Sequence, residues 1–388
     1  MKGCPVIDVG AMQKTMKPLA SPRDTVRALL EVIDVQENGD RPWDIQIHQP
    51  QVYQRFMSEG RLGLGEAYMD GDWDCEDLVG FFDRILRANF TDRVDWWRMI
   101  VPYLRARFLN LQSVHRSREV AERHYDLGND LYRKMLDKRM VYSCAYWKDA
   151  DNLDTAQENK LDLVCRKLGL QPGMKVLDVG CGWGSFARFA AEKYGVEVEG
   201  ITISQEQLVL AQEHCAGLPV HLHLKDYRDL TGQWDRVVSI GMMEHVGRKN
   251  YDTYMTLVRD WLTPDGMALI HTIVGRYPVR RADPWITTYI FPGGMTPTPG
   301  QLGTAIEGKL VLEDLHNIGA DYDKTLMAWW ANFEKAWPEL EDQYGERFYR
   351  MWRYYHHYCA GSFRARYNHV YQMVLSKQGV PGGYDAVR

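Results

Sequence analysis

The sequence lacks the features that mark several special classes of protein. No apolar run in its 388 residues approaches the roughly 18 residues that cross a bilayer, so no membrane-spanning helix is expected. The segment from Met1 to Leu19 lacks the apolar stretch of a signal peptide, which predicts a cytosolic protein. The net charge of −5 argues against a general nucleic-acid binder.

Cysteines are few and widely spaced. The 7 Cys include no CxxC pair, which excludes a zinc knuckle and a thioredoxin-type redox motif, and no metal site is predicted. An odd number of scattered cysteines fits free thiols in a reducing compartment.

The residues that are present describe an ordinary globular protein with one peculiarity. Hydrophobic residues are 45% and charged residues 26% of the chain, which excludes wholesale disorder, and the length allows one large or two moderate domains. Aromatic residues reach 12%, with 13 Trp and 22 Tyr, in a chain that otherwise looks soluble and acidic. Composition alone does not explain this surplus.

The character of the chain changes twice along its length. Residues 1–91 mix short strand-like and helix-like pieces and predict a small α+β domain. Residues 92–123 hold seven Arg against four acids, with aromatic residues at helical spacing. This pattern predicts a basic amphipathic linker, which either packs on the main domain or contacts a membrane surface. Residues 124–388 form the third part.

This third part alternates between strand-like and helix-like patterns. Strands are expected at 175–179, 196–203, 220–224, 236–240 and 267–272, and helices at 185–194, 205–216 and 251–262. Such alternation predicts a parallel sheet with helices on both faces. Ligands bind at the carboxyl ends of the strands in sheets of this kind, so the chemistry is expected there.

A glycine-rich loop follows the first of these strands. Gly180, Gly182 and Gly184 form G-x-G-x-G, with Asp178 two residues ahead, rather than the dinucleotide spacing G-x-G-x-x-G. The segment resembles motif I of the class I S-adenosylmethionine-dependent methyltransferases. The resemblance implies an α/β fold, with a Rossmann-like mixed sheet covered by helices on both faces, after a small α+β N-terminal domain. It also implies that the loop meets the amino-acid part of S-adenosylmethionine.

The second strand departs from the common pattern of that superfamily. An acid that binds the ribose hydroxyls is expected near Thr202, but the nearest one, Glu199, lies three residues too early. The hydroxyl and amide groups of Thr202, Ser204 and Gln207 can bond a ribose diol instead. The residues placed to meet the adenine are Asp226, Tyr227 and Arg228.

Longer motifs narrow the family. They are His124–Tyr132, Tyr142–Trp147, Gly241–Gly247, His271–Ile273 and Gly319–Asp323, together with Leu62–Trp73 near the N-terminus. They resemble the cyclopropane-fatty-acyl-phospholipid synthases of the longer, bacterial type, over roughly Pro22 to Lys377. The mycolic-acid cyclopropane synthases share several of these motifs but lack the N-terminal domain.

The resemblance implies a reaction and a site. A methylene group passes from S-adenosylmethionine to a cis double bond of a phospholipid acyl chain, through a carbocation that bound bicarbonate deprotonates. An alternative outcome is a methyl- or methylene-branched chain. The family's bicarbonate site carries over to Cys144, Glu244, His271, Ile273 and Tyr322, and its cofactor site includes Tyr142 and Ser143. Cys144 is not expected to act as a nucleophile, since methyl transfer to an alkene needs none. His245 is interpreted as structural.

The surplus of aromatic residues then has two possible roles. One is a dry, cation-tolerant wall for the acyl chain, formed by Tyr142, Tyr146, Trp147, Trp183, Tyr289, Phe291 and Tyr322. The other is a membrane surface at residues 347–366, which hold five Arg and no acid; a core-packed helix is the alternative there. The Pro/Gly-rich segment 278–300 is expected to form a mobile lid. The implied partners are a phospholipid bilayer surface and its unsaturated acyl chains. The resemblance also implies a cytoplasmic homodimer that is peripherally associated with the inner face of the membrane.

Overall fold

The computed structural model describes residues 21–88, 128–279 and 282–388, and contacts group them into two compact units. The first unit contains residues 21–88 together with Asp283–Pro292 and Pro338–Ala365. The second contains Gly128–Ala282, Gly293–Trp337 and Arg366–Arg388. Two segments that the sequence analysis assigned to the region from 124 onward therefore pack with the N-terminal residues instead. The basic segment 92–123 lies outside the described residues.

The first unit is mainly helical. Its elements are α1 Pro22–Val32, β1 Gln46–Ile47, α2 Val52–Glu59, α3 Arg61–Met69, β2 Trp73–Asp74, α4 Leu78–Ala88, α14 Pro284–Tyr289 and α17 Glu341–Arg364. The strand-like pieces expected within residues 1–91 correspond here to β1 and β2, which pair antiparallel. Aromatic rings fill the core, among them Trp73 and Phe81 with ring centroids 5.4 Å apart.

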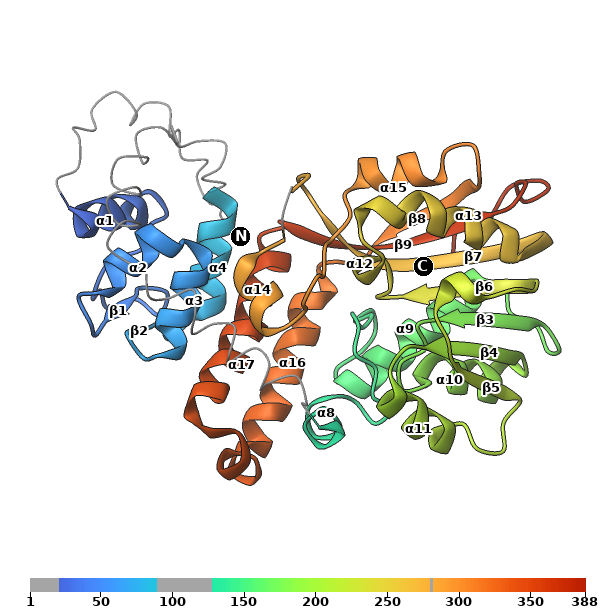
Figure 1. The fold of residues 1–388 in the computed structure, drawn as a ribbon, viewed down its shortest axis with the longest axis horizontal. Helices are drawn as coiled ribbons and strands as arrows, with labels where there is room; N and C mark the ends of the chain where they lie inside the picture. The colour runs from blue at the N-terminus through green and yellow to red at the C-terminus, as the bar shows by residue number, and fades with distance from the viewer. Residues whose placement is uncertain (1–20, 89–127, 280–281) are drawn as a thin grey trace. The chain divides into compact units, whose positions relative to one another are not determined.

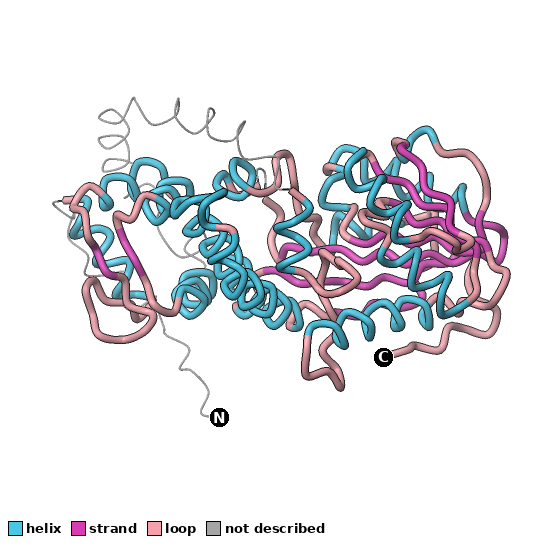
Figure 2. The backbone as a smooth tube through the Cα atoms, turned by 90° about the horizontal axis from the view of Figure 1, so that it is seen from below, coloured by secondary structure: helices cyan, strands magenta, loops and turns pink. Residues whose placement is uncertain are grey.

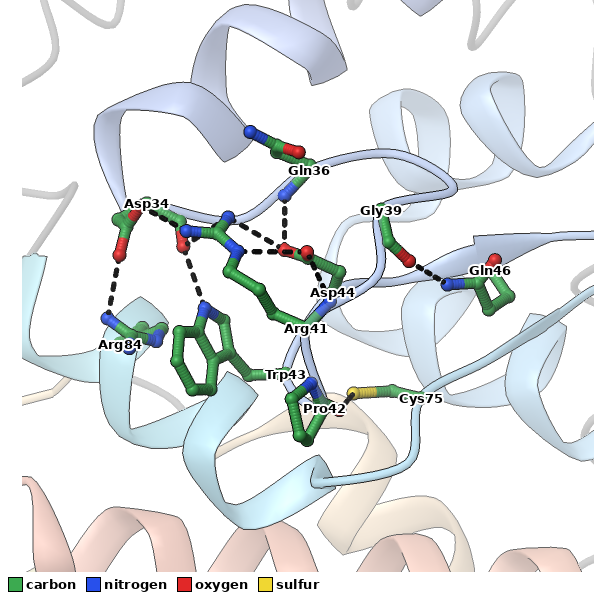
Figure 3. Close-up of polar contacts among 10 residues, drawn as sticks. All are labelled: Asp34, Gln36, Gly39, Arg41, Pro42, Trp43, Asp44, Gln46, Cys75 and Arg84. Carbon is green, nitrogen blue, oxygen red and sulfur yellow. Dashed lines mark hydrogen bonds and ion pairs between the residues drawn. The ribbon is translucent and has the colours of Figure 1, made fainter.

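A buried carboxylate organises the loop between α1 and β1 (Figure 3). Asp44 is 1% exposed and accepts hydrogen bonds from the Gln36 amide at 2.7 Å and from the Arg41 side chain at 2.8 and 2.9 Å. Arg41 also donates to the Asp34 carboxylate at 2.6 Å. A buried carboxylate is stable only when such donors surround it, so this loop has one defined conformation.

Helix α17 decides between the two interpretations of residues 347–366. Phe348, Trp352 and Tyr354 on this helix are at most 3% exposed, and Tyr354 packs edge-on against Phe82 of α4 at 5.1 Å. Arg350 donates to the Tyr68 and Trp73 carbonyls at 2.6 and 3.0 Å. Most aromatic residues of this segment are therefore core residues of the first unit, as the core-packed alternative predicted.

The second unit is built on a seven-stranded sheet in the order β5-β4-β3-β6-β7-β9-β8 (Figure 1). The strands are β3 Lys175–Val179, β4 Glu197–Thr202, β5 Val220–Leu224, β6 Trp234–Ile240, β7 Leu262–Gly275, β8 Val311–Asn317 and β9 Asn368–Ser376. β3 to β7 run parallel to one another, and β9 is antiparallel to both β7 and β8. The sheet is therefore mixed, as the fold class predicted.

Helices cover both faces of this sheet (Figure 2). They are α8 Asn129–Met135, α9 Leu153–Lys167, α10 Ser185–Tyr194, α11 Gln205–His214, α12 Met243–Val246, α13 Tyr251–Trp261, α15 Pro299–Ile306 and α16 Asp321–Ala336, with 3-10 turns η2 Tyr227–Asp229, η3 Arg248–Asn250 and η4 Trp337–Glu339. Side chains alternate along each strand, so Val176 packs with α9 and α10 while Leu177 packs with α13 and α15. No helix in the described ranges is long and apolar enough to cross a membrane.

Candidate active site

The glycine loop lies between β3 and α10, where the sequence predicted it. Gly180, Gly182 and Gly184 have φ angles of +83°, +55° and +78°, a region that side chains with a Cβ rarely adopt. The amides of Gly180 and Cys181 both donate to the Ile201 carbonyl, at 3.0 and 2.9 Å, which ties the loop to the end of β4. The loop is thus a fixed concave backbone that a ligand can approach closely.

The predicted ribose-binding groups lie together beyond β4. Gln207 Oε1 and Thr202 Oγ1 are 3.2 Å apart, and the Ser204 amide donates to Thr202 Oγ1 at 3.2 Å. Ser204 caps α11, because its hydroxyl accepts from the Gln207 amide at 3.3 Å. The three side chains form one small polar group at the carboxyl end of the strand.

The residues predicted to meet the adenine form a turn after β5. The Asp226 carboxylate receives two hydrogen bonds from the Arg228 guanidinium, at 2.7 and 2.8 Å, and these bonds lower the pKa of Asp226 to about 2. Tyr227 of this turn is buried and packs against Tyr254, with the two ring centroids 5.2 Å apart. The ion pair and the buried ring give the turn a rigid shape.

A loop between α8 and α9 brings Tyr142, Ser143 and Cys144 together. Gln157 of α9 donates to the Ser143 carbonyl at 2.9 Å and to the Val141 carbonyl at 3.3 Å. Lys160, on the same face of α9, donates to Ser143 Oγ at 2.8 Å. Two buried side chains of one helix therefore hold this loop in place.

Aromatic rings connect this loop with the glycine loop and with α16. Trp183 lies 5.0 Å from Tyr132, Tyr132 lies 5.2 Å from Tyr142, and Tyr142 lies 5.0 Å from Trp329 (centroid to centroid). Tyr322 continues the series, 5.9 Å from Trp329. Three of the predicted wall residues, Tyr142, Trp183 and Tyr322, thus belong to one continuous aromatic cluster.

Polar side chains occupy the α9 face of the sheet near the carboxyl ends of its strands. Side chains alternate between the two faces along each strand, which places on this face Asp178 of β3, His271 of β7 and Gln372 of β9. Within the sheet, His271 pairs with Ile240 on one side and with Gln372 on the other. Gln372 Nε2 lies 3.4 Å from His271 Nδ1. Burial, with a smaller contribution from Lys160, holds the pKa of His271 well below its usual range, so the imidazole is neutral.

Glu244 is placed by α12, directly after β6. Its Oε1 accepts from the Ile273 amide at 2.6 Å, and its Oε2 is shielded from solvent with no partner among the described residues. Burial raises the pKa of Glu244 to about 7, although the bond from Ile273 lowers it. One oxygen is thus fixed by the sheet and the other is left for a ligand.

The remaining predicted site residues come from three elements. Cys144 is fully buried, and burial keeps the pKa of its thiol well above the usual range, which fits a thiol that is not a nucleophile. Tyr322 lies in the first turn of α16. His271 was expected at the end of a strand at 267–272; β7 continues to Gly275, three residues beyond that range, so His271 lies inside the strand.

Comparison with known proteins decides the family. Residues 112–373 match the family model described as mycolic acid cyclopropane synthetase. The chain is also 51% identical over 361 residues to the cyclopropane-fatty-acyl-phospholipid synthase of Escherichia coli (strain K12), covering 93% of this chain and 94% of that protein. The chain belongs to the cyclopropane synthase family.

Solved structures of this family share the fold of about two thirds of the chain. The cyclopropane synthase MmaA2 from Mycobacterium tuberculosis is 33% identical, with a TM-score of 0.62 over 67% of this chain and 98% of that one. The mycolic acid cyclopropane synthase CmaA1, complexed with SAH and CTAB, is 36% identical, with a TM-score of 0.61 over 66% of this chain and 96% of that one. The class I methyltransferase fold predicted from the glycine loop is therefore confirmed.

Other predicted wall residues make different contacts. Tyr289 and Phe291 belong to the first unit, where Tyr289 donates to Glu66 at 2.8 Å and Phe291 packs 6.0 Å from Tyr355. Tyr146 packs on His316 of β8, 5.7 Å away. The segment 278–300, expected to be a lid, is divided between the units, and residues 280–281 lie outside the described residues.

Three buried polar residues behind the site were not predicted from the sequence. Gln157, Lys160 and Gln372 are each 0% exposed. The sequence signal for such a residue is a polar side chain at a position where the apolar pattern of a helix or a strand predicts a hydrophobic one. Gln372 is an example, because it interrupts the apolar run in His369–Leu375. Buried polar groups need partners, so such positions deserve a functional hypothesis.

Proposed function

We propose that the chain transfers a methylene group from S-adenosylmethionine to the cis double bond of an unsaturated acyl chain in a membrane phospholipid, forming a cyclopropane ring. The membership of the cyclopropane synthase family supports the reaction class. The observation that supports it most within the site is the buried Oε2 of Glu244, which has no partner among the described residues, while its Oε1 accepts from the amide of Ile273, two residues after His271 on β7.

The second unit fits S-adenosylmethionine as its methyl donor. The glycine loop would lie against the amino-acid end, where Asp178 Oδ2 is buried without a hydrogen-bond partner among the described residues. The group formed by Thr202, Ser204 and Gln207 would bind the ribose, and the rigid turn at Asp226–Arg228 would lie beside the adenine. When bound, S-adenosylmethionine supplies an electrophilic methyl group on a sulfonium centre.

The aromatic cluster suits the positive charge of this chemistry. Ring faces attract cations, and the rings of Tyr142, Trp183 and Tyr322 extend from the glycine loop to α16. A site enclosed by such rings excludes water, which would otherwise trap a cationic acyl chain as an alcohol.

The catalytic residues also fit a small oxyanion such as bicarbonate. The neutral His271 imidazole, the Tyr322 phenol and the Cys144 backbone amide are donors for its oxygens, while Glu244 Oε2 and the Ile273 carbonyl are acceptors for its hydroxyl. When bound, bicarbonate supplies the base for the proton that leaves the new methyl group. Glu244 holds that base through its free oxygen, and the Ile273 amide keeps the carboxylate in position.

Because the proposed substrate lies in a bilayer, we propose that the protein works as a peripheral enzyme at the inner face of the membrane. An acyl chain in a bilayer must reach the site from the lipid surface. The relative of 51% identity is named for acyl phospholipids, which supports this substrate class.

Product analysis tests the proposed function directly. The enzyme is incubated with vesicles of cis-unsaturated phospholipid and methyl-labelled S-adenosylmethionine, and the extracted lipids are analysed by mass spectrometry and NMR. High-field cyclopropane protons and a mass gain of one methylene are expected. A vinylidene signal would show that the product is the alternative, a methylene-branched chain, and not a ring. An absence of label in the lipid would overturn the proposal.

The role of bicarbonate is tested in the same vesicle assay. The rate is expected to fall when bicarbonate is removed by degassing and to recover when it is added back at constant pH. A rate that does not change on removal would exclude bicarbonate from the reaction.

A further inference from the structure

A buried lysine lies beside the glycine loop and has no role in the function proposed above. Lys160, in the middle of α9, is 0% exposed. Within the described ranges its ammonium has one hydrogen-bond acceptor, Ser143 Oγ, at 2.8 Å. An ammonium group has three donors and loses its hydration on burial, so one neutral acceptor leaves it poorly satisfied.

A second buried lysine on the same helix has a direct carboxylate partner. Lys167 is also 0% exposed, but its ammonium lies 3.3 Å from the Asp314 carboxylate of β8. Lys160 has no carboxylate at such a distance among the residues described by the structure. Asp137 and Asp178 act on its charge only from beyond ion-pair distance, so an anionic group of a ligand would complete the compensation.

The hydrogen bond between Lys160 and Ser143 also fixes the direction of the serine hydroxyl. Because lysine can only donate, Ser143 Oγ accepts from it, and the hydroxyl proton is left for another acceptor. Gln157 holds the Ser143 carbonyl at 2.9 Å, so the residue cannot turn away. Ser143 thus presents a donor that is polarised by the cation behind it.

An unpartnered acid lies close to the same point. Asp178 is 2% exposed, and its Oδ2 has no hydrogen-bond partner in the described parts of the chain. Burial raises the pKa of Asp178 to about 7, and the charge of Lys160 opposes this rise. A cation-backed donor beside a free carboxylate is complementary to a ligand that carries both an anion and an ammonium.

We propose that Lys160 is a positioning residue for S-adenosylmethionine: it holds Ser143 so that the hydroxyl donates to the cofactor carboxylate, while Asp178 accepts from the cofactor ammonium. This inference rests on the proposed function, in which S-adenosylmethionine binds at the glycine loop. Bicarbonate is the other oxyanion of the site, and it is chemically similar to a carboxylate. The pairing of Ser143 with an acid favours the zwitterionic end of the cofactor.

Binding of three nucleosides to the full chain tests this role without catalysis. Calorimetry is used to measure the dissociation constants of S-adenosylhomocysteine, of its decarboxylated analogue, which keeps only the ammonium, and of 5′-deoxy-5′-methylthioadenosine, which keeps neither group. Lys160→Met is expected to weaken S-adenosylhomocysteine about tenfold or more, as the loss of a hydrogen bond that involves a charge predicts. The other two ligands are expected to change by less than about twofold. Lys167→Met is the matched control and leaves all three constants unchanged.

A second variant keeps the test decisive if Lys160→Met does not fold. Ser143→Ala leaves the ammonium in place and is expected to weaken S-adenosylhomocysteine selectively as well. Where both single variants fold, the double variant is no weaker than Lys160→Met alone, because the two residues act in series. An equal loss for all three ligands would reduce Lys160 to a structural role and overturn the inference.

Two further outcomes separate the sources of failure. Unchanged binding of S-adenosylhomocysteine by Lys160→Met, with a higher bicarbonate requirement in the vesicle assay, would overturn the inference in favour of bicarbonate. Failure of the unmodified protein to bind S-adenosylhomocysteine would overturn the proposed function itself.

Discussion

The backbone amide of Ile273 donates to Glu244 Oε1 at 2.6 Å, while Glu244 Oε2 is enclosed without a partner in the described residues. The edge of β7 therefore fixes one oxygen of the carboxylate and leaves the other available to a ligand. A carboxylate held in this way is preorganised to accept a proton at one defined point.

Replacement of Glu244 should separate turnover from cofactor binding. We expect Glu244→Gln, which keeps the shape of the side chain, to lower the rate of methylene transfer roughly 100-fold, the range found for loss of a general base or its support. Binding of S-adenosylhomocysteine should stay within about twofold, since Glu244 lies after β6 and not in the glycine loop. The vesicle assay and calorimetry measure the two quantities.

The control for this variant is Glu307→Gln, an exposed carboxylate at the end of α15. It should leave both the rate and the dissociation constant unchanged. A Glu244→Gln enzyme with the wild-type rate would remove Glu244, and with it the proposed oxyanion site, from the mechanism.

The same substitution should stabilise the fold in a pH-dependent way. Burial raises the pKa of Glu244 from its ordinary value of 4.5 to about 7, so the folded state favours the protonated acid. The free energy of unfolding therefore falls as the pH rises from 4.5 to about 7. Above that pH, the cost of the buried carboxylate charge is fully present. Glu244→Gln mimics the protonated form, so its free energy of unfolding should exceed that of the wild type at pH 8 by on the order of 3 kcal/mol.

Urea denaturation at pH 5 and at pH 8 measures this difference. The two proteins should have similar stability at pH 5, where Glu244 is protonated in the folded state, and should diverge at pH 8. A constant difference at both pH values would show that the substitution acts through packing and not through the charge.

The sequence predicted the elements whose pattern is local. The bounds of β3, α10 and β5 agree with the expected ranges 175–179, 185–194 and 220–224, because each is a short apolar or amphipathic run ended by glycine or by a turn. The loop conformation at Gly180, Gly182 and Gly184 was predictable for the same reason. Most catalytic candidates came from long motifs of the family resemblance, and no local physical pattern would have assigned Glu244 or Tyr322 alone.

What the sequence did not show depends on contacts between distant segments. Helix α17 has an amphipathic, arginine-rich pattern that also fits a lipid surface, and only its packing on α3 and α4, nearly 300 residues away, makes its aromatic face a core. The burial of Lys160 and Gln157 could not be predicted either, because a polar residue on a helix is usually exposed to solvent. Their burial follows from the face of the sheet that α9 covers.

The contribution of each arginine of α17 to the stability of the first unit should therefore depend on how buried its hydrogen-bond partners are. Arg350 donates to the Tyr68 and Trp73 carbonyls and to the Asp74 carboxylate at 2.7 Å, so Arg350→Met leaves partly buried acceptors unpaired. We expect a loss of about 2–4 kcal/mol in the free energy of unfolding. Urea denaturation followed by tryptophan fluorescence measures it.

Arg347→Met is the matched control on the same helix. Arg347 and its partner Asp70 are 42% and 39% exposed, so this ion pair should contribute less than about 1 kcal/mol. Arg347→Met also tests the lipid alternative, because it removes an exposed charge and leaves the fold intact. The variant should bind anionic vesicles as tightly as the wild type does. Weaker, salt-dependent binding would instead support a contact between this helix and lipid.

The contact between α17 and α4 gives a last, purely steric prediction. A Cβ added at Gly361 would lie 2.6 Å from Phe82 Cβ and 3.1 Å from the Val79 carbonyl oxygen, so Gly361→Ala forces the two helices apart. We expect a loss of about 1–3 kcal/mol in the free energy of unfolding. Gly303→Ala in α15 is the control, since a Cβ there meets no atom within 4 Å and alanine favours a helix by about 0.5–1 kcal/mol over glycine. Urea denaturation should therefore move the two midpoints in opposite directions, and equal midpoints would show that α17 and α4 do not touch at Gly361.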